Sequence, residues 1–528
     1  MAGNIVSDPS LNATLSKLPY AEGAGWNLRS GCLEGTRRAL LDDICNWARD
    51  TAPTAELYLL TAVAGAGKSA IAHTVAQRCA HSGILLTSFF FSRDVAGRDR
   101  PDRLFSTLAY ELAQVDPEVG KYVASAIELD RSLPSAPLSR QFEDLVVVPS
   151  QKLQSNRPLV IVLDALDEGA SSELLWILCN ELNRLPGLFR VVVTSRPDER
   201  LTDLSTKHHV HCTEIDLEDA NNLADIQEYI KYWASHLAKA KWSVLKNTWL
   251  TGQLLVDVIQ KAEGLFQWVS VVFSYLETVR DPLKQLKIFI SNSALSGASP
   301  ERKMDLTYAE IFKKCNWDDS DFVHGYQLII GAVVAAKIPM SKEALQRLHG
   351  DVISIQISVL LAPLSSLLPG IEDAKRPMRI LHQSLNDFIT VRTLNMPETV
   401  KFYLDKKEHS GRLALICLDL INKTLPLDIA NLHYLSANTT TEPGIPDLAS
   451  EITKCLSEEA LYTCIYWVHH LEDARVLSSI LTNTVKKFIS ETMVDWIETV
   501  AVLKWNISLS NIWSCINVSI TELEFLIE

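Results

Sequence analysis

The stretch Ala62-Val-Ala-Gly-Ala-Gly-Lys-Ser69 decides the fold of this chain. It follows an apolar run, Leu57–Thr61, that predicts a β-strand, and it leads into Lys68–Arg78, which predicts a helix. A strand, a glycine loop and a helix N-terminus form a cradle for phosphate, because the loop amides and the positive end of the helix dipole attract an anion. This is the P-loop pattern, which predicts an α/β fold that binds a nucleoside polyphosphate.

The residues of this loop have distinct expected roles. Lys68 is the expected contact to the β- and γ-phosphates, and Ser69 is the expected Mg²⁺ ligand. Ala62 stands where the pattern has its first glycine, and alanine is tolerated there if φ stays negative. The alternative is a glycine-rich turn with an incidental lysine, and the order of strand, loop and helix favours the P-loop. The remaining phosphate contacts are expected from Ala64, Gly65, Ala66, Gly67 and Ala70.

Length and charge bound the class of protein. The 528 residues correspond to three or four domains at ~150 residues each, and 47% of them are hydrophobic. The formal net charge of −14 argues against broad binding to nucleic acid or to an anionic membrane surface, and leaves a local basic patch as the alternative. The apolar runs are too short or too interrupted to span a membrane. The ten cysteines form no C-x-x-C pair and the start carries no secretory signal, so we expect reduced thiols and a cytoplasmic location.

Strand and helix signals alternate over the first part of the chain. Helices are predicted over Cys32–Asp50 and Pro101–Val115. Near-continuous apolar strands separated by helices indicate a parallel sheet covered by helices on both faces. The further predicted strands are Ile84–Phe91, Leu159–Leu163, Phe189–Thr194 and Val210–Ile215.

Changes in composition and in the predicted secondary structure divide the chain into five regions. Residues 1–30 are expected to be a flexible leader, and residues 31–215 a nucleotide-binding domain. Helical periodicity dominates residues 216–300, which end in a linker-like stretch over 291–300. Residues 301–400 are mostly helical with a β-capable piece, Met378–Leu381, and residues 401–528 are helical with a loop-like interruption over 436–446.

A group of acids follows the third predicted strand. Asp164 directly after a buried strand suits Mg²⁺ coordination through water, given the P-loop upstream. Asp167 and Glu168 are positioned to orient and activate an attacking water, and the choice of the base between them needs geometry. The alternative is a solvated loop that carries acids, which the P-loop context disfavours.

Arg196 ends the fourth predicted strand, in Thr194-Ser-Arg-Pro197. The C-terminal edge of a parallel sheet faces the ligand crevice, so Arg196 is a candidate sensor of the γ-phosphate. The alternative is an arginine that caps a turn before Pro197. The guanine-specific Asn-Lys-x-Asp loop is missing, which favours ATP over GTP.

These segments, in this order, resemble the NACHT nucleotide-binding domain of the STAND class of P-loop signalling NTPases, and most of all its fungal, basidiomycete-like set. The resemblance covers roughly residues 30–400. The segments that carry it are Cys32–Arg37, Ala64–Ala72, Ser88–Arg93, Val160–Glu168, Val193–Pro197, Ala262–Trp268 and Ile380–Phe388. Leu385 departs from the family pattern, which has an aromatic residue there.

The resemblance implies a nucleotide-gated switch for signal transduction. ADP would hold a closed state, and exchange for ATP would allow homo-oligomerisation and contact with unidentified protein partners. It implies that residues 301–400 form a winged-helix-like domain, from which His382 reaches the β-phosphate of ADP. On sequence alone, His382 is a core or surface histidine. The roles carried over are phosphate and Mg²⁺ binding for Lys68 and Ser69, metal positioning for Asp164, hydrolysis for Asp167 and Glu168, and sensing for Arg196.

Two alternatives to a slow regulatory ATPase remain open. A non-catalytic scaffold that keeps a nucleotide as a structural wedge is suggested by Ala62 and by the lack of a recognisable C-terminal WD, ankyrin or tetratricopeptide sensor. A metabolic P-loop kinase would need an acceptor pocket, and the helical half offers no obvious one. Fungal relatives suggest innate-immunity or heterokaryon-incompatibility roles by analogy only.

Overall fold

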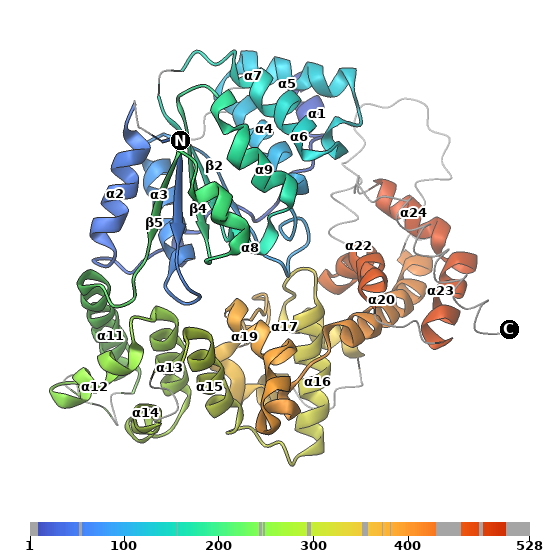
Figure 1. Ribbon diagram of the computed structural model, residues 1–528. Coiled ribbons are helices and arrows are strands. Elements are labelled where there is room, and N and C mark those ends of the chain that lie inside the picture. The colour runs from blue at the N-terminus through green and yellow to red at the C-terminus, as the bar shows by residue number, and fades with distance from the viewer. Residues whose placement is uncertain are drawn as a thin grey trace. The chain divides into compact units, whose positions relative to one another are not determined.

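The structure is a computed structural model, shown in Figure 1. It describes residues 9–51, 55–155, 157–241, 245, 249–292, 297–350, 357–371, 373–380, 382–428, 456–474 and 479–502. The chain forms two compact units, residues 1–304 and residues 305–528. The boundary between the units falls within one helix, α15 (Pro300–Phe312).

The first unit is built on a five-stranded parallel sheet with the order β2-β3-β4-β1-β5. All five predicted strands are present to within one residue at each end, and the predicted α/β fold is confirmed. The register pairs Thr61 with Ser195 and Phe90 with Asp164, so the carboxyl ends of these strands meet at one edge. The strands are β1 (Leu57–Thr61), β2 (Leu85–Phe90), β3 (Leu159–Asp164), β4 (Phe189–Ser195) and β5 (Val210–Glu214).

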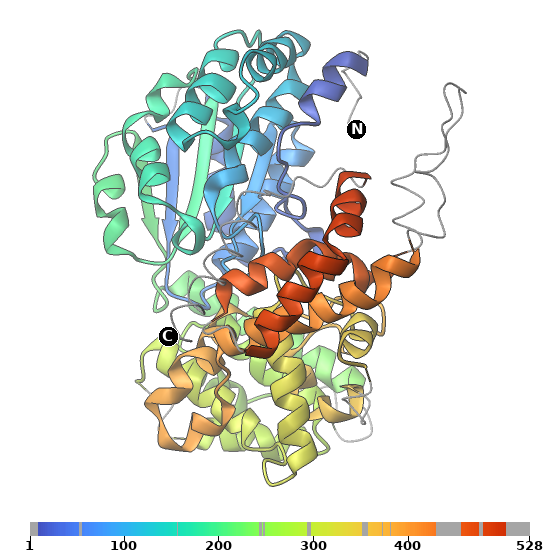
Figure 2. The same ribbon diagram turned by 90° about the vertical axis from the view of Figure 1, so that its right-hand side faces the viewer.

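Successive residues of the central strands enter two different hydrophobic cores. In β3, Leu159, Ile161 and Leu163 pack with one core, whereas Val160 and Val162 pack with the other. The first core contains α4 (Leu104–Val115), α5 (Pro117–Leu129) and α9 (Ser172–Asn180), and the second contains α2 (Arg38–Arg49) and α3 (Lys68–His81). This alternation follows from the two-residue period of a strand. Helices therefore cover both faces of the sheet, as Figure 1 and Figure 2 show.

The helices of the first unit surround and then follow the sheet. The helix predicted over Cys32–Asp50 begins only at Arg38, because the preceding residues form a turn in which Gly35 and Arg37 take left-handed conformations. The helices are α1 (Pro9–Leu15), α2 (Arg38–Arg49), α3 (Lys68–His81), α4 (Leu104–Val115), α5 (Pro117–Leu129), α6 (Leu138–Gln141), α7 (Val148–Ser150), α8 (Leu166–Gly169), α9 (Ser172–Asn180), α10 (Thr202–Ser205), α11 (Ala220–Ala240), α12 (Gln253–Ala262), α13 (Phe266–Thr278) and α14 (Pro282–Ser291).

The expectation of a flexible leader over residues 1–30 is wrong for residues 9–30. Leu15, Leu18, Ala21 and Ala24 are buried in the core of the α4 face. The carbonyl of Ala24 also accepts a hydrogen bond of 2.9 Å from the backbone N–H of Phe90 in β2. These apolar residues recur every third position and cover the core. The polar and glycine residues between them led to the expectation of a flexible segment. Residues 1–8 lie outside the described residues.

The second unit is helical in the residues that the structure describes. An aromatic cluster of Phe312, Tyr326, Phe388 and Phe402 is buried in it, and the half-buried Trp317 packs against this cluster. Its helices are the remainder of α15, α16 (Ser320–Ala335), α17 (Lys342–His349), α18 (Ile357–Leu360), α19 (Gln383–Thr390), α20 (Lys406–Asp428), α22 (Glu458–Asp473), α23 (Ser479–Glu491) and α24 (Met493–Val502).

Several sequence expectations fall in or near the second unit. The β-capable piece at Met378 lies beside an isolated antiparallel bridge between Ser341 and Pro377, and Leu381 lies outside the described residues. Most of the linker-like stretch over 291–300 is described, except residues 293–296, and the loop-like stretch over 436–446 lies outside the described residues. The assignment of residues 301–400 as a winged-helix-like domain stays a prediction.

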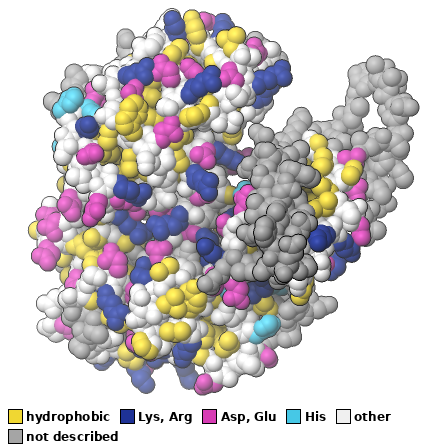
Figure 3. All heavy atoms as spheres, turned by 45° about the vertical axis from the view of Figure 1, so that its right-hand side comes forward, with side chains coloured by type: hydrophobic (Ala, Val, Ile, Leu, Met, Phe, Trp, Pro, Cys, Tyr) yellow, Lys and Arg dark blue, Asp and Glu magenta, His cyan; other side chains and the backbone are white. Residues whose placement is uncertain are grey.

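Charged and hydrophobic side chains are mixed on the surface that one view of the molecule shows. On the face drawn in Figure 3, basic and acidic side chains are interspersed among hydrophobic ones. Among the described helices, none has both the length and the hydrophobicity that crossing a bilayer requires.

Candidate functional site

The predicted phosphate loop connects β1 to α3 at the edge where the carboxyl ends of the strands meet. Gly65 and Gly67 have φ values of 86° and 94°, a left-handed conformation that glycine adopts without strain. Ala62, which replaces the first glycine of the pattern, is buried and is not one of the three non-glycine residues of the described chain with positive φ. Its N–H lies 3.3 Å from the carbonyl of Ser195, so the loop entry is tied to β4.

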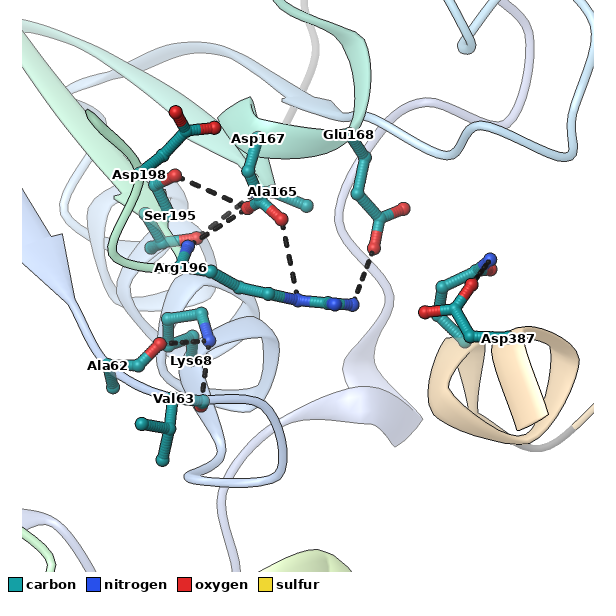
Figure 4. A network of polar contacts seen from close by, with 12 residues as sticks. Ala62, Val63, Lys68, Ala165, Asp167, Glu168, Ser195, Arg196, Asp198 and Asp387 are labelled. Carbon is teal, nitrogen blue, oxygen red and sulfur yellow. Dashed lines mark hydrogen bonds and ion pairs between the residues drawn. The ribbon is translucent and has the colours of Figure 1, made fainter. Parts of the chain in front are cut away.

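Lys68 points back toward the carbonyls of its own loop. Its Nζ donates to the carbonyl of Ala62 at 2.8 Å and to that of Val63 at 3.0 Å (Figure 4). Burial lowers the pKa of Lys68 to about 8, and the charge of Asp167 opposes that shift. The ammonium therefore lies inside the loop, held by two of the loop's own carbonyl oxygens.

Asp164 is the last residue of β3, and it is buried. Its carboxylate accepts hydrogen bonds from the hydroxyls of Thr194 and Ser69. Burial raises the pKa of Asp164, and the bonds from Thr194 and Ser69 oppose the shift. A carboxylate and a hydroxyl are hard oxygen donors of the kind that Mg²⁺ prefers, so Ser69 and Asp164 fit the metal that the sequence predicts.

The turn after Asp164 is strained and tightly packed. Ala165 has φ 57° and ψ 49°, a left-handed conformation that costs a non-glycine residue about 1–2 kcal/mol. The hydroxyl of Thr194 accepts a hydrogen bond of 3.2 Å from the Ala165 N–H and holds the turn. At the end of α8, a Cβ on Gly169 would lie 2.1 Å from the ring of Phe91, which leaves room only for glycine. This turn brings the next two acids back over the sheet edge.

Asp167, Glu168 and Arg196 form one network. The backbone N–H of Arg196 donates to Asp167 Oδ1 at 3.0 Å, and its Nε lies 3.4 Å from Asp167 Oδ2. Its Nη2 lies 3.5 Å from Glu168 Oε1, and the side chain extends between the two acids in Figure 4. Burial raises the pKa of Glu168 to about 7, against the opposing charges of Arg93 and Arg196. A carboxyl that titrates near neutrality is suited to accept a proton from water.

The structure thus brings together most of the residues that the sequence singles out. The phosphate loop, with Ala64, Gly65, Ala66, Gly67, Lys68, Ser69 and Ala70, lies at the same sheet edge as Asp164, Asp167, Glu168 and Arg196. Their catalytic and ligand roles stay predictions.

His382 lies in the second unit, directly before α19. Its Nε2 forms no hydrogen bond with the residues that the structure describes. Burial and the charge of Arg379 lower the pKa of His382 to about 4, so its imidazole is neutral at physiological pH. A neutral imidazole can donate one hydrogen bond to a phosphate. The predicted contact of His382 with a nucleotide stays a prediction.

Three residues help to hold the site, and their part in it was not predicted from the sequence. Thr194 orients Asp164 and Ala165, and the guanidinium of Arg37 donates to the carbonyl of Ala66 at 2.8 Å. The N–H of Gln267 donates to the carbonyl of Gly65 at 3.2 Å. Arg37 and Gln267 stand in segments that only the family resemblance singled out, because a contact across 30 to 200 residues leaves no local pattern.

The parallel sheet, the glycine loop before α3 and the acid at the end of β3 define the first unit as a P-loop NTPase fold. A family model described as Nephrocystin 3, N-terminal, matches residues 35–196, which is less than a third of the chain but includes the phosphate loop and four of the five strands. No curated protein matches the chain.

One similar solved structure is that of the Aeropyrum pernix Orc1 protein in complex with DNA. It shares 15% sequence identity with this chain and covers 68% of it, while the chain covers 92% of that protein. The TM-score is 0.30, which supports no inference about the function of this chain.

Proposed function

We propose that this chain is a STAND-type NACHT signalling protein, an ATP/ADP-dependent conformational switch with slow ATP hydrolysis that controls oligomerisation. The observation that carries the proposal is the convergence of Lys68, Ser69 and Asp164 with the network of Arg196 at one sheet edge. Binding and hydrolysis of a nucleoside triphosphate require a P-loop next to a buried acid, here Asp164, and a second acid whose pKa lies near neutrality, here Glu168.

The residues of the first unit have complementary roles in this proposal. Lys68 exchanges the carbonyls of Ala62 and Val63 for phosphate oxygens, so its charge moves a short distance within the loop. Ser69 and Asp164 hold Mg²⁺, which when bound neutralises charge on the phosphates. Glu168 accepts the proton of the attacking water, since its pKa lies near neutrality and Asp167 is engaged by the backbone of Arg196.

Arg196 links hydrolysis to nucleotide state. Its guanidinium bridges the two acids, with Nε 3.4 Å from Asp167 Oδ2 and Nη2 3.5 Å from Glu168 Oε1. A γ-phosphate at the loop offers a stronger anionic partner and draws the guanidinium away from the acids. Glu168 is then released to act on water only when a triphosphate is bound.

The switch itself rests on the second unit and on the family resemblance. His382 would recognise ADP from a winged-helix-like domain, and exchange for ATP would release that domain. To shift a closed population from ~99% to ~1%, the two nucleotides must differ by ~5.5 kcal/mol in their preference for the two states. Homo-oligomerisation, protein partners, a cytoplasmic location and the absence of nucleic acid from the partners belong to the same proposal.

Substitution of His382 tests the switch. His382→Ala is expected to weaken ADP binding and speed ADP release by about tenfold, with ATP affinity changed less than twofold, because one hydrogen bond to a charged group is lost. Stopped-flow displacement of a fluorescent ADP analogue measures the release rate, and His324→Ala, an exposed histidine of α16, is the control. Equal ADP release from the wild type and His382→Ala would rule out the winged-helix contact.

The pH dependence of binding tests the role of Lys68. Its pKa of about 8 means that the free protein loses this positive charge as the pH rises above 8, whereas a bound phosphate stabilises the charged form. The dissociation constant for ADP is therefore expected to rise by up to about tenfold per pH unit above pH 8. Calorimetry between about pH 7.5 and pH 9.5 measures this. A flat profile, or the same slope in Lys68→Arg, would contradict it.

A further inference from the structure

Arg37 has an unusual backbone conformation directly before α2. Its φ is 58°, a left-handed value that a non-glycine side chain rarely adopts, and the residue is buried. Its backbone N–H donates to Asp225 Oδ2 at 3.0 Å, its guanidinium donates to the carbonyl of Ala66, and the guanidinium lies 4.7 Å from the ring centroid of Phe266. Three contacts in different directions thus hold one strained residue, which is typical of a functional position.

Two consecutive peptide units of the phosphate loop are held by donors outside the loop. Arg37 binds the carbonyl of Ala66, and the backbone N–H of Gln267 binds the carbonyl of Gly65. In a trans peptide the C=O and the following N–H point in opposite directions, and the described chain has no cis peptide. The N–H groups of Ala66 and Gly67 are therefore turned away from these two donors, and that of Ala66 lies 3.4 Å from the carbonyl of Val63. Both are loop amides expected to bind phosphate.

Both donors depend on the helices that follow the sheet. Gln267 is the second residue of α13, and the guanidinium of Arg37 stacks on Phe266, the first residue of that helix. The backbone of Arg37 is held by Asp225 of α11, which packs against α13. The contact is close, because a Cβ on Gly65 would lie 2.8 Å from Gln267 Oε1. A displacement of α13 would release both peptide units at once.

We propose that Arg37 is a positioning residue that couples the phosphate loop to α11 and α13, so that nucleotide binding and the docking of these helices stabilise each other. This inference rests on the proposed function, because it assumes that the loop binds a nucleotide. Arg37 acts through the carbonyl of Ala66, and the N-terminus of α13 acts through the carbonyl of Gly65.

The test measures ADP affinity and backbone hydrogen exchange of the full chain. Arg37→Ala is expected to weaken ADP binding by about tenfold, because a buried charged hydrogen bond to the loop is lost. In the wild type, ADP is expected to slow exchange in residues 266–278 of α13. In Arg37→Ala this slowing is expected to disappear even at saturating ADP. Arg38→Ala, an exposed arginine next in the chain, is the matched control and is expected to behave as the wild type.

The possible outcomes separate this inference from the proposed function. Wild-type protein that fails to bind ADP would contradict the proposed function, whereas wild-type affinity in folded Arg37→Ala would overturn only the coupling. Weaker binding with the slowing of α13 exchange intact would also overturn it. If circular dichroism shows Arg37→Ala to be unfolded, Phe266→Leu tests the coupling by the same measurements of ADP affinity and α13 exchange. This substitution removes the aromatic ring on which the guanidinium stacks and keeps Arg37 itself.

Discussion

Lys68→Ala is expected to lower the affinity for ADP and ATP by at least about a hundredfold. The substitution removes an ammonium that lies inside the phosphate loop, where its Nζ is 2.8 Å and 3.0 Å from the Ala62 and Val63 carbonyls. Two charge-assisted hydrogen bonds of about 1.5–3 kcal/mol each account for the loss. Isothermal titration calorimetry with each nucleotide measures the two affinities.

The control for this prediction is a lysine with no role in the loop. Lys121 lies on α5, and its side chain is 64% exposed in a surface ion pair with Glu118. Lys121→Ala is expected to bind nucleotides as the wild type does, because an exposed ion pair contributes little. Nucleotide affinity unchanged in a folded Lys68→Ala variant would contradict the assignment of residues 62–69 as a phosphate site.

Glu168→Gln is expected to slow ATP hydrolysis by about 10²–10⁴-fold while ATP binding is retained. The amide keeps the shape of the side chain but cannot accept a proton from water, and a positioned general base contributes about 10²–10⁴-fold to a rate. Single-turnover release of phosphate from bound ATP, followed with purified protein, measures the effect. The hydrolysis rate is expected to fall by about 10²–10⁴-fold, with a dissociation constant for ATP within about threefold of the wild type.

Two further variants serve as controls for Glu168→Gln. Glu218→Gln changes an exposed acid outside the site and is expected to leave hydrolysis unchanged. Asp167→Asn is expected to slow hydrolysis less than Glu168→Gln, because Asp167 accepts from the backbone of Arg196 and so acts by placing that arginine. If the wild type releases no phosphate, or if Glu168→Gln releases it as fast as the wild type, the nucleotide is a structural wedge and the protein a scaffold.

The strands and the acids of the site could be predicted because their signals are local. Leu57–Thr61 and Leu159–Asp164 are short apolar runs that end in a turn, and buried parallel strands require that composition. The loop with Gly65 and Gly67 carries its own conformational signature, since both positions have positive φ. Parallel strands place their carboxyl ends at one edge, so Asp164 and Arg196 were expected near the loop from topology alone.

The features that were missed depend on contacts between distant segments. Ala24 and Phe90 are 66 positions apart, and nothing in the polar sequence around Ala24 indicates that its carbonyl pairs with β2. The left-handed conformation of Arg37 is set by Asp225 and Phe266, which lie about 190 and 230 positions further on. Tertiary contacts here override local preference, which would have continued the helix through Arg37.

The alternation of β3 between two cores has a consequence for how the length of this chain can vary. Inserting or deleting one residue in the middle of β3, for example at Ile161, would turn the residues beyond it to the opposite faces of the sheet and move Asp164 out of register with the end of β4. Natural length differences among related chains are thus expected in the connections, such as residues 130–137, and not within this strand. The register of β3 in the sheet, more than the identity of any one apolar residue, keeps Asp164 in place.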